Sequence, residues 1–217
     1  MSNNDSFIDE VTEEVRRDKL FALMRRYGWI AVLGVILIVG GAAWTEWQKS
    51  RHQADSRAFG DALLAAMQAD DPAARQTALA GVAAGGGRKA VLDLLQSAEA
   101  LAAQDKAAAL EQLAAVAADA TLPEAYRQMA SLKSVLIAGD EMDAATRDTT
   151  LAGLAQPGAP FRVLAMEQQA LVLAEGGKTD EALALFRQIL EEPDLTQGLR
   201  ARVQQMIVAL GGEAAAA

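Results

Sequence analysis

A run of 19 residues without a charged side chain, from Tyr27 to Thr45, limits what this chain can fold into more than any other feature. As a helix rising about 1.5 Å per residue, the run would extend about 28 Å, close to the roughly 30 Å hydrocarbon thickness of a bilayer. Aromatic residues, which favour the membrane interface, stand at both ends of the run. We therefore predict an uncleaved transmembrane helix over residues 27–47. Its predicted interface residues are Arg25, Arg26, Tyr27, Trp29, Trp44 and Trp47.

Two other structures are compatible with this run. A buried core helix rarely carries aromatic residues at both ends with a basic pair outside them. A cleaved signal peptide could use the small residues Gly41-Ala42-Ala43 as its cleavage site. The uncharged run is, however, longer than the roughly 7–15 residues of a signal peptide's apolar region, and its preceding segment is also long. These features favour an uncleaved membrane anchor over a core helix or a signal peptide.

The basic residues near the run predict its orientation. Arg16, Arg17, Lys19, Arg25 and Arg26 precede it, whereas Lys49, Arg51 and Arg57 follow it. Because cytoplasmic flanks carry the excess of Lys and Arg, the N-terminus is predicted to be cytoplasmic and the rest of the chain exported. Residues 1–26 should form an amphipathic head with an apolar stripe, which either docks a partner or is a frayed tail. Phe7, Ile8, Val11 and Val15 make up the stripe.

The charge of the exported part excludes some ligands. Residues 46–217 carry 15 basic and 23 acidic groups, a net charge of −8, so this domain should be repelled by nucleic acid and by anionic lipid. The absence of cysteine leaves the redox compartment undetermined. The abundance of Ala, Leu, Gln and Glu, with only five prolines, predicts helix nearly throughout.

Glycine, proline and aspartate divide the exported part into short helices. At Asp70-Asp71-Pro72 an aspartate should cap the second helix after the anchor and the proline should lie in its first turn, and Gly85-Gly86-Gly87 should end it. These glycines lack the lysine and the preceding strand of a phosphate-binding loop. The predicted helices span residues 46–69, 72–84, 88–104, 106–118, 124–138, 143–155, 161–175, 179–191 and 196–210, and residues 213–217 form a disordered tail.

A repeat of 36 or 37 residues links these helices in pairs. Small and apolar residues recur at positions i, i+4 and i+7, a spacing that places them on one inward helix face. The four sets are Ala73/Thr77/Ala80, Ala109/Leu113/Val116, Ala145/Thr149/Ala152 and Ala182/Phe186/Ile189. The last set, followed by Pro193, resembles the A-x3-F-x2-A core and closing proline of a tetratricopeptide repeat, although the diagnostic Trp and Leu-Gly pair are absent. The predicted fold is all-α, a single N-terminal transmembrane helix followed by a tetratricopeptide-like solenoid over residues 48–212 with about four degenerate repeats; an unrelated helical bundle is the alternative.

The whole layout resembles that of a known family. An acidic head, the segments DEVTEEVRRDKL and RRYGW, one span and about four weak repeats are similar to the YfgM-like family. Members of that family are single-pass proteins of the bacterial inner membrane whose tetratricopeptide domain lies in the periplasm. They are ancillary subunits of the Sec translocon and work with a periplasmic chaperone. The resemblance therefore implies the same location, both partners and the role of a membrane-bound scaffold.

The sequence lacks the residues that a metal site or a catalytic triad would need. The only histidine is His52, close to the predicted interface, and no cysteine is present, so neither a metal cluster nor a catalytic triad can be assembled. Asp140-Glu141-Met142-Asp143 lacks the spaced ligands of a calcium loop and should instead form a turn and a helix N-terminus. We predict no enzymatic activity, no catalytic residue, no cofactor, no metal and no small-molecule substrate.

A partner groove is what the tetratricopeptide resemblance adds, because the first helix of each pair lines a concave surface in that fold. The mixture is apolar and slightly acidic and would suit an apolar or basic segment, unless its leucines contact neighbouring helices instead. The groove candidates are Val91, Leu94, Ala98, Leu101, Arg127, Ala130, Ser134, Ile137, Leu164, Glu167, Leu171 and Glu175. Two other functions remain open, an accessory subunit of another inner-membrane complex such as a respiratory assembly, and an adaptor for envelope or cell-division machinery.

Overall fold

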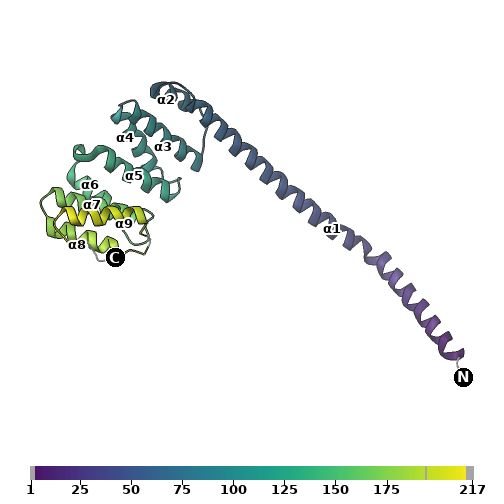
Figure 1. Ribbon diagram of the computed structural model, residues 1–217. Coiled ribbons are helices and arrows are strands. Elements are labelled where there is room, and N and C mark those ends of the chain that lie inside the picture. The colour runs from purple at the N-terminus through teal and green to yellow at the C-terminus, as the bar shows by residue number, and fades with distance from the viewer. Residues whose placement is uncertain (1–2, 194, 214–217) are drawn as a thin grey trace. The chain divides into compact units, whose positions relative to one another are not determined.

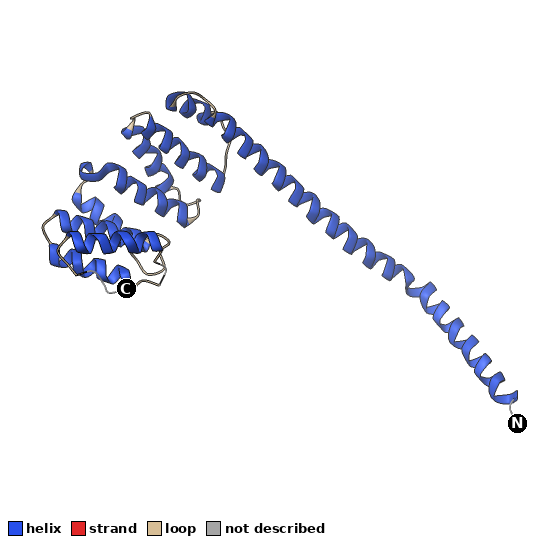
Figure 2. Cartoon of the chain, viewed as in Figure 1, coloured by secondary structure: helices blue, strands red, loops and turns tan. Residues whose placement is uncertain are grey.

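The computed structural model describes residues 3–193 and 195–213, with side chains described at 25, 26, 29, 30 and 33–213 except 194. Every regular element in this part of the chain is a helix (Figure 2). The elements are α1 (Asn3–Met67), α2 (Pro72–Ala80), α3 (Gly87–Ala102), α4 (Lys106–Ala118), α5 (Glu124–Ala138), the short 3-10 helix η1 (Gly139–Glu141), α6 (Ala144–Leu154), α7 (Arg162–Glu175), α8 (Thr179–Leu190) and α9 (Gln197–Ala209). The predicted head stripe at Phe7, Ile8, Val11 and Val15, Tyr27 and residues 214–217 of the predicted tail lie outside the described side chains.

The chain divides into two compact units, Met1–Ala58 and Phe59–Ala217. The first unit consists of α1 up to its residue 58. The second unit contains the last turns of α1 and all the later helices (Figure 1). The transmembrane helix predicted over residues 27–47 is not found: among the residues whose side chains are described, which omit 27, 28, 31 and 32, no helix combines the length and the apolarity needed to cross a membrane.

Aspartates set where several of these helices begin. The carboxylate of Asp71 accepts the backbone N–H of Ala74 at 2.7 Å, and Pro72 follows it in the first turn, as predicted. Asp105 caps α4 and Asp143 caps α6 in the same way. Such caps satisfy N–H groups that have no partner within the helix. The cap at Asp143 confirms the predicted helix N-terminus there, and its hydrogen bonds from Thr146 lower the pKa of Asp143.

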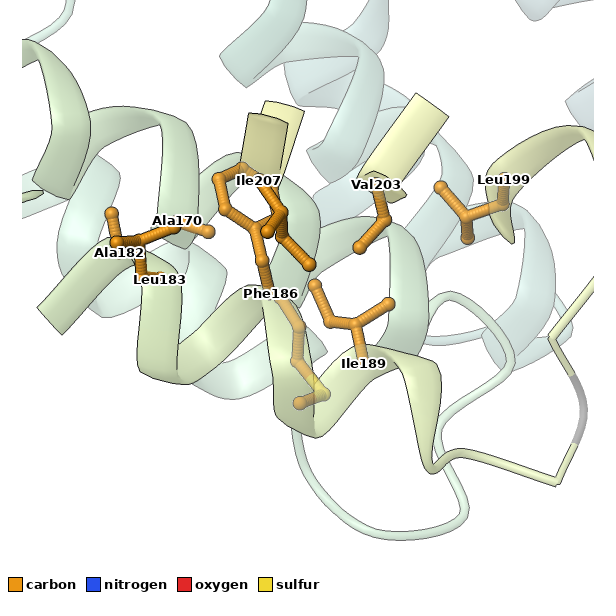
Figure 3. Close-up of a cluster of buried hydrophobic side chains, with 9 residues drawn as sticks. Ala170, Ala182, Leu183, Phe186, Ile189, Leu199, Val203 and Ile207 are labelled. Carbon is orange, nitrogen blue, oxygen red and sulfur yellow. The ribbon is translucent and has the colours of Figure 1, made fainter. Parts of the chain in front are cut away.

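Each helix of the second unit packs mainly on its neighbours along the chain. The antiparallel pairs α3/α4 and α7/α8 are in close contact, as are α4 with α5 and α8 with α9. The core is correspondingly divided into clusters along the array. The largest joins α7, α8 and α9 around Phe186, which is fully buried (Figure 3). A second cluster around Leu113 and Val116 joins α3, α4 and α5. This arrangement is that of a helical solenoid, in which stability is local.

Two of the four predicted inward sets are confirmed. Ala109, Leu113 and Val116 on α4 are buried, and so are Ala182, Phe186 and Ile189 on α8. The sets on α2 and α6 are wrong, because all their members are exposed: Ala73, Thr77, Ala80, Ala145, Thr149 and Ala152.

The inward faces of α2 and α6 are made by leucines. On α6, Leu151 and Leu154 are buried, two residues away from the predicted register. On α2 the buried residue is Leu79. The reason is the larger apolar area that a leucine removes from water compared with alanine or threonine, which rotates the helix to bury the leucines.

Polar contacts add to the apolar clusters between neighbouring helices. Glu99 on α3 is 7% exposed and accepts a hydrogen bond from the guanidinium of Arg75 on α2 at 2.7 Å. Lys106, at the start of α4, donates to the carbonyl of Ala138 at the end of α5. A cation there also interacts favourably with the negative end of the helix dipole. These contacts hold neighbouring repeats in register.

Candidate functional site

The groove positions predicted on α3 are the most accessible of the twelve. Val91 is 37% exposed and Leu101 is 42% exposed, and Ala98 is also exposed. Leu94 is half-buried because it packs against the core cluster around Leu113. Three of the four α3 positions can therefore contact a partner.

On α5 most of the predicted groove positions make contacts within the protein and are not open to a partner. Ala130 is fully buried in the cluster that joins α3, α4 and α5, so its side chain cannot meet a partner. Ser134 donates its hydroxyl hydrogen to the carbonyl of Ala130 at 2.9 Å, and Ile137 packs half-buried against the same cluster. Arg127 is half-buried and lines a cavity of about 370 Å³ between α4, α5 and α6. The exposed apolar residue of α5 is instead Leu136, at 52%.

The positions on α7 divide between surface and interior. Leu164 and Glu175 are exposed, whereas Leu171 packs against the cluster around Phe186. Glu167 is 6% exposed, and its two carboxylate oxygens accept hydrogen bonds from Arg202 on α9 at 2.9 and 2.8 Å. This bidentate contact raises the pKa of Arg202. Glu167 thus links α7 to the last helix, α9, and is not open to a partner.

The accessible part of these three helices includes four large apolar side chains. Val91, Leu101, Leu136 and Leu164 are large apolar side chains at or above a third exposed, and they lie on α3, α5 and α7. The helices α3 and α5 are in direct contact, so Val91, Leu101 and Leu136 belong to adjacent elements. Leu136 was missed because the fixed repeat spacing selects Ile137, its neighbour. The surface suits apolar segments of another protein.

A cavity of about 490 Å³ lies between α6, α7 and the start of α8, and sequence reasoning missed it. Its polar lining includes Arg147, Gln169 and Lys178. The guanidinium of Arg147 is 4.0 Å from Asp140 and 3.9 Å from Asp148, beyond hydrogen-bond distance. The other lining residues are mainly apolar. No sequence motif brings these residues together, because they come from three separate segments.

The first unit presents apolar side chains over a whole helical stretch. Trp29 is 63% exposed and Trp44 is 61% exposed, and Arg25, Arg26 and Trp47 are exposed as well. Between them the large apolar side chains that the structure describes are also exposed: Ile30, Leu33, Val35, Ile36, Leu37, Ile38 and Val39. A helix that is apolar on every side needs to be covered by something other than water.

Tryptophan and arginine form a stack at the end of this stretch. The ring centroids of Trp44 and Trp47 are 5.3 Å apart, and the guanidinium carbon of Arg51 lies 4.0 Å from the centroid of Trp47. The distance is that of a close cation–π interaction.

Comparison with known proteins identifies one family. A family model described as a tetratricopeptide repeat-like domain matches residues 25–212, which include the uncharged run and all of α2–α9. No curated protein and no solved structure matches the chain.

Proposed function

Because this chain belongs to the tetratricopeptide repeat-like domain family, we propose that it is a membrane-anchored scaffold that binds proteins beside a protein-conducting channel. Domains of this family are typically non-catalytic surfaces for protein partners. The exposed apolar residues of α3 and α5, Val91, Leu101 and Leu136, are the first contacts that such a partner would meet. Their small number fits a contact that is weak alone.

The observation that carries the anchor is the exposed apolar stretch of α1. From Leu33 to Val39 every large side chain is apolar and exposed, and tryptophans stand at both ends. A bilayer would cover all sides of such a helix at once, and the uncharged run has the length that a bilayer requires. The five basic residues before the run and three after it support an N-terminus in the cytoplasm and a domain on the opposite side.

The resemblance of residues 9–29 and the adjoining run to the YfgM-like family supports a specific location. The proposed membrane is the bacterial inner membrane, the domain is periplasmic, and the partners are the Sec translocon and a periplasmic chaperone. A subunit of a respiratory assembly or an envelope adaptor would carry the same anchor and repeats. Proteins that copurify with the full chain in mild detergent distinguish these assignments, since each predicts a different complex.

Topology is the first test. Protease added to spheroplasts should degrade the domain after residue 46 and leave the N-terminal head intact. A domain that is digested only after the cells are lysed would contradict the proposed orientation.

The anchor's contribution to binding is the second test. A shared bilayer raises the effective concentration of two membrane proteins, so the anchor and the domain should bind jointly. The chain without residues 1–45 should retain helical circular dichroism but recover the translocon assembly poorly. Replacing only residues 27–45 with an unrelated span should reduce recovery less than deleting them. Equal recovery by the truncated and full-length chains would show that the anchor contributes nothing to partner binding.

A further inference from the structure

The stack of Trp44, Trp47 and Arg51 occupies one side of α1. The three residues follow one another by three and four positions, so they lie along one stripe of the helix. Their side chains are exposed, and the stripe comes directly after the uncharged run. Exposed paired tryptophans beside an apolar stretch require a cover that is apolar on one side and polar on the other.

The stacking decides where the charge of Arg51 lies. In a helix the side chains lean toward the N-terminus, so the guanidinium of Arg51 is carried one turn back, over the ring of Trp47. Trp47 is two residues beyond Thr45, which corresponds to about 3 Å along the axis. The headgroup layer on each side of a bilayer is roughly 5–8 Å thick. The guanidinium therefore stands within the layer that contains the lipid phosphates when the run spans the bilayer.

The stacked guanidinium is also prepared for an anion. The guanidinium carbon lies 4.0 Å from the centre of the Trp47 ring, and the exposed group carries five N–H donors in a planar fork. A planar fork of donors with a fixed orientation matches two oxygens of a phosphate.

We propose that Arg51 and Trp47 form a binding site for the phosphate of a phospholipid headgroup in the leaflet that faces the exported domain. The site rests on the proposed function, because it exists only if residues 27–45 span the bilayer. It gives α1 a fixed depth and a fixed rotation about its axis, since one face of the helix is bound to a lipid. A span held in this way presents the same side to a membrane partner.

The acidity of the exported domain does not oppose this site. Its net charge of −8 repels anionic lipid at long range, but charges more than about 8–10 Å away are largely screened at physiological salt. Next to the membrane, residues 46–58 contain three basic and two acidic side chains. The local charge is therefore positive where the phosphate would bind.

Lys49 provides a matched control. It lies two residues before Arg51, about 200° around the helix, and so carries the same charge at a similar depth on the opposite face. Attraction by charge alone would depend equally on both residues. Binding by a stacked, planar group would depend on Arg51 and on Trp47.

The experiment reconstitutes the full chain in nanodiscs that contain equal amounts of phosphatidylglycerol and phosphatidylcholine, and native mass spectrometry then counts the phosphatidylglycerol that remains bound. Arg51→Gln should reduce retention about fivefold more than Lys49→Gln, the factor expected from one additional charge-assisted contact. Arg51→Lys and Trp47→Leu should approach Arg51→Gln. Inorganic phosphate at millimolar concentration should not compete, which separates a lipid site from a site for free phosphate.

The outcomes are distinguishable. Quenching of tryptophan fluorescence by brominated lipid reports insertion independently of lipid retention. A chain that does not insert refutes both this site and the proposed anchor. A chain that inserts while Arg51→Gln and Lys49→Gln lose lipid equally, or lose none, refutes the site and leaves the anchor standing. Competition by inorganic phosphate would also overturn the lipid assignment.

Discussion

The burial of Phe186 makes a sharp test of how the second unit is stabilised. Its side chain is fully buried on α8, in a cluster to which α7 contributes Met166 and Ala170 and α9 contributes Val203 and Ile207 (Figure 3). Truncating it to alanine removes the whole ring and leaves a cavity between three helices. Such substitutions cost about 3–5 kcal/mol, because the lost transfer free energy and the cavity add together. For a domain of this size the unfolding temperature should fall by roughly 10 °C.

The loss should also be local. Since each helix packs mainly on its chain neighbours, the cluster around Leu113 does not depend directly on Phe186. Hydrogen exchange followed by mass spectrometry should therefore show lost protection in α7, α8 and α9 of the Phe186→Ala variant. Protection in α3 and α4 should change much less. Urea unfolding followed by circular dichroism should show a shallower or biphasic transition.

Leu136→Ala is the matched control. Leu136 is 52% exposed on α5, so its truncation should change the free energy of unfolding by no more than about 0.5 kcal/mol. If Phe186→Ala were no more destabilising than this control, the packing around α8 would be wrong. If protection were lost equally from α3 to α9, the unit would be a single cooperative core, and the argument for local stability would fail.

Three further outcomes follow from contacts in the second unit. Arg75→Ala leaves the nearly buried carboxylate of Glu99 without its partner and should cost about 2–3 kcal/mol in chemical denaturation, whereas the double variant Arg75→Met, Glu99→Met should recover much of it. Hydrogen bonding to Arg162 lowers the pKa of Glu192, so this pair's stabilisation is present above the ordinary carboxyl pKa and is lost as pH falls through the lowered value; thermal unfolding of Arg162→Gln should accordingly depend less on pH between roughly 5 and 3. Gly212→Ala would place a Cβ 2.8 Å from Ile207 and 2.9 Å from Leu183, so its melting temperature should fall, while Gly198→Ala, with open space around it, should be neutral or stabilising.

The helix boundaries could be predicted from the sequence because strong local signals mark them. The predicted ranges 106–118 and 124–138 are those of α4 and α5. The helices α7 and α8 differ from prediction by one residue at one end, and α6 and α9 by one residue at each end. Aspartate caps, glycine and proline act within one turn of the chain, so they can be recognised without the tertiary structure. The larger differences are in α2, which ends at Ala80, before the predicted glycines, and at the ends of α1 and α3, each of which ends two residues before the prediction.

The inward faces were harder to predict, because they depend on what each helix meets. The fixed repeat spacing succeeds on α8, where Ala182, Phe186 and Ile189 agree with it, and fails on α6, where Leu151 and Leu154 lie two positions away. A helix rotates to bury its largest apolar side chains, whatever the spacing to the next repeat. The leucines of α6 were visible in the sequence and would have been the better guide.

Contacts between distant segments could not be predicted at all. Glu167 was expected to face a partner, but Arg202 binds it from a helix 35 residues later in the chain. The cavity beside Arg147 likewise draws on three segments. Nothing in the local sequence of α7 distinguishes a carboxylate that will be paired from one that remains in solvent, because the pairing depends on where α9 packs.

The exposed residues of α3 and α5 and the exposed apolar stretch of α1 would contribute differently to binding under the proposed function. Only a few large apolar side chains on α3 and α5 are open to a partner, and affinity at such surfaces depends on a few well-buried anchors. Under the proposed function, a partner in the same bilayer would not need high intrinsic affinity, because the anchor would already supply a high local concentration. Tethering also allows the contact to exchange rapidly, since weak contacts dissociate fast. A lipid bound at Arg51 would orient the tether without strengthening the contact itself. A small apolar surface is therefore what the proposed tethered scaffold would require, whereas a freely diffusing adaptor would need a larger one.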